Sequence, residues 1–108
     1  MMTLKLNSTN REQITVELWD NSARIDKLVE KQKVGSQVLL PLIVKILKSN
    51  KKNFSDLTEV TVNTGPGSFT GTRVGVAVAN ALGFALNIPV NGKKGKIAVP
   101  MYAKSKFD

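Results

Sequence analysis

The feature that most constrains the fold of this chain is a glycine-rich run between a strand-like and a helix-like segment. The run reads Gly65-Pro66-Gly67-Ser68-Phe69-Thr70-Gly71, after strand-like residues 59–63 and before a helix-like stretch that reaches Leu86. Proline sets φ at about −65°, and glycine permits positive φ or a close backbone approach. The run therefore predicts a tight turn with a defined path, and a strand, a turn and a helix in this order indicate an α/β fold.

Two roles are open for this turn. The N–H groups at the start of the helix can hold an anion, or the turn can dock a helix of a neighbouring chain. The spacing differs from that of a P-loop, because Thr72 and Arg73 stand where the phosphate-binding lysine would follow the last glycine. We expect Ser68 and Thr70 to cap the helix that they begin.

Alternating apolar residues predict an antiparallel start. Residues 3–8 and 13–20 alternate as strands joined by a hairpin turn at 8–11, and the second strand places three apolar residues on one face: Ile14, Val16 and Leu18. A third strand is predicted over 23–31, with Ala23, Ile25 and Val29 as its apolar residues.

The rest of the chain alternates helices and strands. A helix is predicted from 35–36, with Ser36 as its N-cap, to Ser49, and a second one from Ser68 or Phe69 to Leu86. Short strands are predicted over 58–63 and from residue 88. The order is βββαβαβ, that of an α/β domain with a mixed sheet and two main helices.

The first helix is apolar over an arc of about 240°, which is more than the stripe of roughly 100° that covers a sheet. The excess predicts a second burial surface. In the second helix a ridge of small residues recurs every fourth position: Gly71, Gly75, Ala79 and Gly83. This ridge packs either on its own sheet or against another backbone. A separate stripe mixes polar and apolar residues, as protein interfaces do, and consists of Arg73, Ala77, Asn80 and Phe84.

The amino-acid composition limits the kinds of function that we expect for this chain. The 108 residues contain no Cys and no His, so a thiolate nucleophile, a histidine base and a catalytic zinc site are not expected. The 16 Lys and Arg residues exceed the 8 Asp and Glu residues and give a net charge of +8. This excess fits either an RNA-binding surface or a merely solvated, lysine-rich surface. No apolar run reaches the roughly 20 residues that span a bilayer, and a cytoplasmic location is expected.

The run from Thr64 to Ala77, continued by residues 81–90, closely resembles the TsaB (YeaZ) family. Three further segments are similar to that family: Leu4–Thr9, Leu39–Ile43 and Phe54–Leu57. The resemblance covers most of residues 3–92. It implies one actin-like (ASKHA, ribonuclease H-like) domain over residues 1–92.

The resemblance also implies a role. TsaB is a non-catalytic subunit of the machinery that makes threonylcarbamoyladenosine in tRNA, next to the anticodon. Its two helices pair with the catalytic paralogue TsaD or with a second copy, and the ATPase TsaE joins them. The positions that we expect at this interface are Gln37, Val38, Pro41, Val44, Lys45, Arg73, Val74, Ala77, Asn80, Ala81 and Phe84. No catalytic, cofactor or metal site is expected.

Two departures from the family qualify these expectations. Asn7 stands where the family usually has an aspartate, and a neutral amide lacks the charge that Mg²⁺ sites favour. Residues 93–108 are expected to form a basic tail or short strand in place of the family's second domain, which puts recruitment of TsaE in doubt. The alternative functions are a basic, homodimeric tRNA-binding accessory and a degenerate nucleotide-binding protein.

Overall fold

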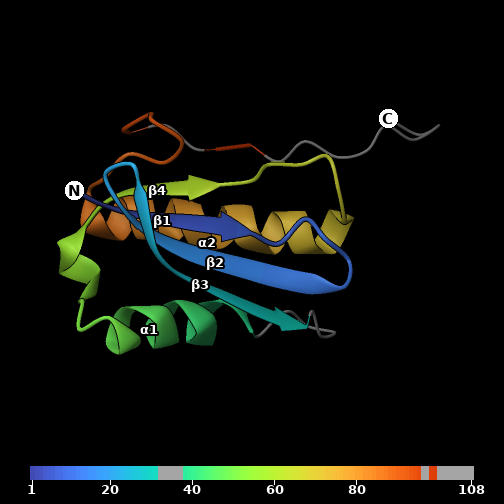
Figure 1. The fold of residues 1–108 in the computed structure, drawn as a ribbon. Helices are drawn as coiled ribbons and strands as arrows, with labels where there is room; N and C mark the ends of the chain where they lie inside the picture. Colours follow the sequence, from blue (N-terminus) through green and yellow to red (C-terminus); the bar gives the residue numbers. More distant parts are fainter. Residues whose placement is uncertain (32–37, 96–97, 100–108) are drawn as a thin grey trace.

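A four-stranded mixed sheet with two helices on one of its faces makes up the domain (Figure 1). The computed structural model describes residues 1–31, 38–95 and 98–99. The strand order is β3-β2-β1-β4, and α1 contacts β2 and β3 whereas α2 contacts β4 and β1. In chain order the elements are β1 (Met2–Asn7), β2 (Gln13–Asp20), β3 (Ala23–Lys31), α1 (Leu39–Ser49), the 3-10 helix η1 (Phe54–Asp56), β4 (Leu57–Val62) and α2 (Phe69–Leu86).

The pairing of the strands explains the mixed sheet. β1 runs antiparallel to β2, with Leu4 opposite Leu18, and parallel to β4, with Leu4 opposite Val60. The α1 segment provides the crossover that a parallel pair requires. The predicted order is confirmed as far as α2, but the strand predicted from residue 88 is reduced to one parallel bridge between Val60 and Val90.

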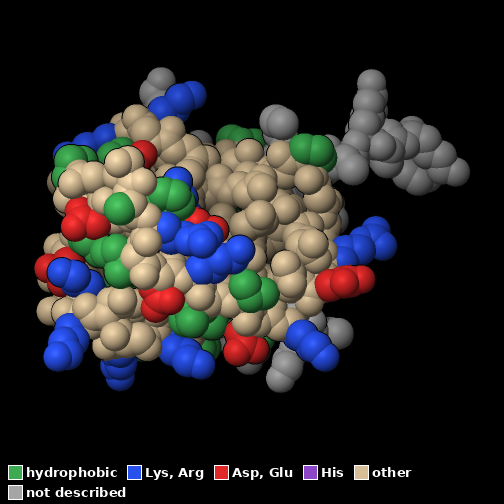
Figure 2. Space-filling model, viewed as in Figure 1, with side chains coloured by type: hydrophobic (Ala, Val, Ile, Leu, Met, Phe, Trp, Pro, Cys, Tyr) green, Lys and Arg blue, Asp and Glu red, His purple; other side chains and the backbone are tan. Residues whose placement is uncertain are grey.

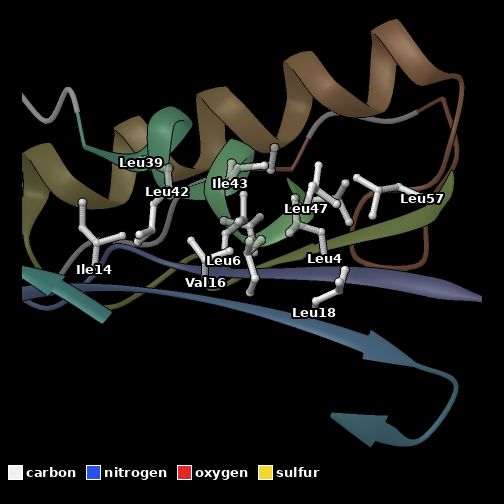
Figure 3. Close-up of a cluster of buried hydrophobic side chains, with 14 of the residues drawn as sticks. Leu4, Leu6, Ile14, Val16, Leu18, Leu39, Leu42, Ile43, Leu47 and Leu57 are labelled. Atoms are coloured by element: carbon white, nitrogen blue, oxygen red, sulfur yellow. The ribbon is translucent and has the colours of Figure 1, made fainter. Parts of the chain in front are cut away.

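The core lies between the sheet and the two helices. The predicted inward face of β2 is confirmed, because Ile14, Val16 and Leu18 are fully buried. In Figure 3 these side chains and those of β1 point toward the side chains of α1. The α1 residues that reach this core are Leu39, Leu42, Ile43, Ile46 and Leu47. Because the strands alternate, their polar residues face away from the helices.

The prediction of which β3 residues face the core is wrong. Ile25 and Val29 are 44% and 46% exposed, whereas Asp26 and Leu28 face the helix side and are half-buried. A bulge between Leu18 and Trp19 shifts the pairing of β2 with β3, so that Leu18 lies opposite Asp26. β3 is also the sheet edge, and α1 covers it only in part. Side-chain polarity alone does not decide the face of such a strand.

Helix α1 begins at Leu39, later than predicted, with Val38 at the N-cap and no side-chain hydrogen bond there. The predicted cap Ser36 lies outside the described residues. Pro41 is the third residue of α1, where a missing N–H costs no intrahelical bond. No helix within the described ranges combines the length and apolarity needed to cross a membrane.

Candidate interface and motif turn

The glycine-rich turn is pressed against the loop between β1 and β2. Gly65 has a φ of 102°, a value that glycine adopts readily. A Cβ atom on Gly67 would lie 2.6 Å from the carbonyl oxygen of Thr9 and 2.7 Å from its Cβ atom. The Ser68 N–H donates to the same Thr9 carbonyl at 2.8 Å. Only glycine at position 67 permits this approach, which fixes the path of the chain into α2.

Hydrogen bonds inside the chain occupy several N–H groups of the turn. Besides Ser68, the Gly65 N–H donates to Asn63 Oδ1 at 3.0 Å, and the Gly71 N–H donates to Ser68 Oγ at 3.3 Å. Thr72, at the position of the P-loop lysine, is fully buried, and its hydroxyl has no partner within the described residues. Of the two roles predicted for the turn, these contacts disfavour an anion site, whereas the docking of a neighbouring chain's helix stays a prediction. The contacts themselves show that the turn holds the start of α2 against the loop between β1 and β2.

Ser68 is the N-cap of α2, as predicted, but Thr70 is not a cap. Thr70 is the second residue of the helix and is exposed, whereas the Ser68 hydroxyl accepts the Gly71 N–H. The cap position requires extended backbone ahead of the first helical residue, and Ser68 has a ψ of 127°.

Replacing Ser68 with alanine is expected to lower the free energy of unfolding by about 1 kcal/mol, because one N–H at the start of α2 loses its acceptor. Urea unfolding followed by circular dichroism measures the change. Thr70→Ala is the matched control and is expected to have less than half that effect. Equal losses for the two variants would contradict the assignment of the cap.

The ridge of small residues packs on its own chain. All four of its members are buried. A Cβ atom on Gly75 would collide with Ser8 Oγ, and one on Gly83 would collide with Val90 Cγ2. Ser8 is buried and donates a hydrogen bond from its hydroxyl to the Gly71 carbonyl at 2.6 Å. The alternative in which the ridge receives a partner's backbone is therefore excluded.

Of the predicted interface residues that the structure describes, Pro41, Lys45, Arg73, Ala77, Ala81 and Phe84 are exposed. The other four, Val38, Val44, Val74 and Asn80, are half-buried, and Val38 and Val74 pack against the core. We call the six exposed residues, together with the exposed Leu40, the outer helix surface. Phe84 is 91% exposed and Leu40 is 51% exposed. Gln37 lies outside the described residues. Leu40 was not among the predicted interface residues. As an exposed apolar residue of α1 it shows that the apolar arc of this helix exceeds what the sheet covers.

Sequence patterns did not identify the role of Asn80. Its amide donates to the Ala98 carbonyl at 3.0 Å and accepts the Ala98 N–H at 2.9 Å. Ala98 is partly buried and packs against the hydrophobic core. A side chain that pairs with both backbone groups of a residue 18 positions away gives no local sequence signal, so Asn80 could be placed on a face but not assigned a partner.

Charge is dispersed on the face shown in Figure 2, where Lys and Arg side chains lie both around the outline and in the middle of the face, with Asp and Glu side chains among them. Within residues 1–31, 38–95 and 98–99 no three carboxylates gather where a metal ion could bind. Asn7, at the position of the family's aspartate, accepts the Thr9 N–H at 3.1 Å and the Thr9 hydroxyl at 2.8 Å. Its side-chain oxygen thus stabilises the loop between β1 and β2.

Comparisons with known proteins agree with this geometry. A family model described as TsaD, tRNA N6-adenosine threonylcarbamoyltransferase, matches residues 30–93, which is more than half of the chain. The tRNA threonylcarbamoyladenosine biosynthesis protein TsaB of Buchnera aphidicola subsp. Schizaphis graminum is 41% identical over 54 residues, covering 50% of this chain and 26% of that protein. The TsaB protein of Haemophilus influenzae is 32% identical over 91 residues, covering 82% of this chain and 38% of that protein.

A comparison with a solved structure supports the actin-like fold. YeaZ from Pseudomonas aeruginosa superimposes with a TM-score of 0.75 at 29% identity, over 83% of this chain and 43% of that one. The predicted actin-like fold is thereby confirmed, and the chain spans less than half the length of these relatives. Sequence and structure agree on one assignment: this chain belongs to the tRNA N6-adenosine threonylcarbamoyltransferase family and, within it, to the TsaB (YeaZ) group.

Proposed function

We propose that this chain is a non-catalytic subunit of the machinery that makes threonylcarbamoyladenosine in tRNA, and that it binds the paralogue TsaD through the outer helix surface. The relatives' names supply the pathway. The exposure of Phe84 carries the proposal of an interface, because an aromatic side chain that is 91% exposed on a regular helix has a large apolar area to bury against a partner.

Other exposed residues of the two helices support a protein partner. Ala81 and Ala77 are exposed about one and about two turns before Phe84 on α2, and small residues let a partner helix approach closely. Leu40 and Pro41 are exposed apolar residues in the first turn of α1, and Lys45 and Arg73 are exposed cations on the same two helices. Exposed aromatic and apolar residues accompanied by arginine are typical of protein interfaces.

A homodimer through the same surface is the competing assembly. Because both assemblies bury Phe84, TsaD and a second copy of the chain would exclude one another. A non-catalytic role is consistent with a chain that has no His or Cys for proton transfer or nucleophilic attack.

Replacing Phe84 with aspartate is expected to weaken binding to TsaD by about thirtyfold or more, because truncation of a buried aromatic anchor commonly costs at least about 2 kcal/mol. Size-exclusion chromatography with light scattering, on this chain alone and mixed with TsaD from the same organism, measures the change. Val29→Asp is the matched control, since Val29 is an exposed apolar residue on β3, away from both helices.

The proposal predicts that the wild type and Val29→Asp form a heterodimer at the expense of any homodimer, whereas Phe84→Asp stays monomeric. A heterodimer that tolerates Phe84→Asp would contradict the proposed surface. A chain that remains a homodimer and ignores TsaD would contradict the proposed partner.

A further inference from the structure

A hollow of about 260 Å³ lies beside the C-terminal end of α2, next to the outer helix surface. Its apolar lining comes from Gly83, Ile88 and Val90, and the exposed ring of Phe84 stands at its border. Asn80 also reaches it, but its amide is already paired with Ala98. The polar groups left at the border belong to Asn87 and to the turn that follows Val90.

That turn holds two lysines in a defined place. Asn91 and Gly92 have φ values of 52° and 79°, which is the two-residue hairpin turn expected of an Asn-Gly pair. Lys93 then bridges back to Val90, with its N–H donating to the Val90 carbonyl at 3.1 Å. The Asn91 side chain fastens the turn to β4, because its oxygen accepts the Val62 N–H at 2.8 Å and its amide donates to the Val62 carbonyl at 3.1 Å.

The hollow is electrically polar. Lys93 and Lys94 line one side, and none of the described residues that line it is acidic. The other side is the C-terminal end of α2, which carries a partial negative charge, and the Asn87 side chain. The Gly83 and Phe84 carbonyls there already accept the N–H groups of Ile88 and Asn87, so Asn87 Oδ1 supplies the acceptor. A ligand that is anionic at one end, apolar in its middle and a hydrogen-bond donor at the other end complements this lining.

We propose that this hollow binds one nucleotide of single-stranded RNA. Phosphates would lie against Lys93 and Lys94, the base would contact the Phe84 ring, and its exocyclic amino group would face the side-chain oxygen of Asn87 at the end of α2. Aromatic stacking and lysine–phosphate contacts are the two usual sources of affinity for single strands. An amide side chain can also read the edge of an adenine.

The identification of that RNA with tRNA rests on the proposed function, whereas the site itself is a property of this chain alone. Phe84 belongs both to the outer helix surface and to the border of the hollow, so TsaD and the RNA would compete for its ring. The RNA test therefore leaves Phe84 unchanged and contains no TsaD, so that failure of one proposal does not imply failure of the other.

Fluorescence anisotropy with a fluorescein-labelled tRNA anticodon stem-loop tests the site on the full chain. Lys93→Glu with Lys94→Glu is expected to weaken binding by about tenfold or more and to lower the slope of log K against log salt by about two. The matched control is Lys27→Glu with Lys31→Glu, two exposed lysines on β3, at the sheet edge opposite to β4. This control makes the same change in net charge. We expect its loss of RNA affinity to be less than about a third of the loss caused by the Lys93 and Lys94 substitutions.

A second variant separates base contact from charge. Asn87 has a φ of 55°, a backbone conformation that glycine adopts readily, so Asn87→Gly removes the amide while the end of α2 is kept. We expect about threefold weaker binding or more, with an unchanged salt slope. Circular dichroism verifies that each variant is folded.

Competition identifies the class of ligand. Unlabelled single-stranded RNA is expected to displace the probe at lower concentration than a fully paired RNA duplex, AMP or polyglutamate. Equal loss in the β3 control pair would show that dispersed charge alone binds RNA and would overturn the site. Equal competition by AMP or by polyglutamate would overturn the assignment to RNA, and so would the absence of saturable binding.

Discussion

Gly75→Val is expected to be the most disruptive single substitution in α2, with a loss of about 3 kcal/mol or more in the free energy of unfolding. The added Cβ atom would collide with the hydroxyl of Ser8, and Val62 Cγ2 lies 3.6 Å from the same point. Ser8 cannot move away without breaking its buried hydrogen bond to the Gly71 carbonyl. Overpacking at such a site costs about 1–3 kcal/mol, and a buried polar group that loses its partner costs about 1–3 kcal/mol more.

Ala77→Val is the matched control, because it adds the same kind of side chain to the same helix on the exposed side. It is expected to cost less than about 1 kcal/mol, the difference in helix propensity. Urea unfolding of both variants, followed by circular dichroism, measures the contrast. A Gly75→Val protein as stable as Ala77→Val would show that α2 does not pack on β1 through its small residues.

Ile43→Ala is expected to lower the free energy of unfolding by about 3 kcal/mol. Ile43 is fully buried between α1 and the sheet (Figure 3), so its removal loses apolar burial and leaves a cavity. Leu40→Ala is the matched control on the same helix. Because Leu40 is 51% exposed, its truncation is expected to cost less than about 1 kcal/mol.

The same pair of variants also distinguishes an effect on the stability of the chain from an effect on its binding to TsaD. If the outer helix surface receives TsaD, Leu40→Ala weakens the heterodimer although the chain alone is nearly as stable as the wild type. Equal destabilisation by Ile43→Ala and Leu40→Ala would mean that α1 is buried on both sides within this chain, and the excess apolar arc would then need no partner.

Local patterns were sufficient wherever one physical signal dominated. Strict alternation placed Ile14, Val16 and Leu18 on the buried face of β2, because successive residues of a strand point to opposite faces. The glycine-rich turn and the Ser68 cap located the start of α2, since both act over a few neighbouring residues. The width of the apolar arc indicated a second burial surface on α1, which the exposure of Leu40 agrees with.

Other features depended on contacts between distant parts of the chain. The predicted inward face of β3 was wrong because a bulge between Leu18 and Trp19 sets the register of β3 against β2. The later start of α1 at Leu39 and the reduction of the last strand to Val90 likewise had no clear local signal. The division of the chain into residues 1–92 and 93–108 and the partner residues remain predictions.

By itself, the sequence determined the family, the order of the elements up to α2 and the inward faces of the central strands, because these follow from short motifs and from periodicity. It also showed that α2 carries a ridge of small residues. Only the tertiary structure decided that this ridge faces Ser8 and Val90, which leaves Phe84 on the free side of the helix. A helical period says which residues share a face, but the side toward which that face turns depends on the strands that pack against it.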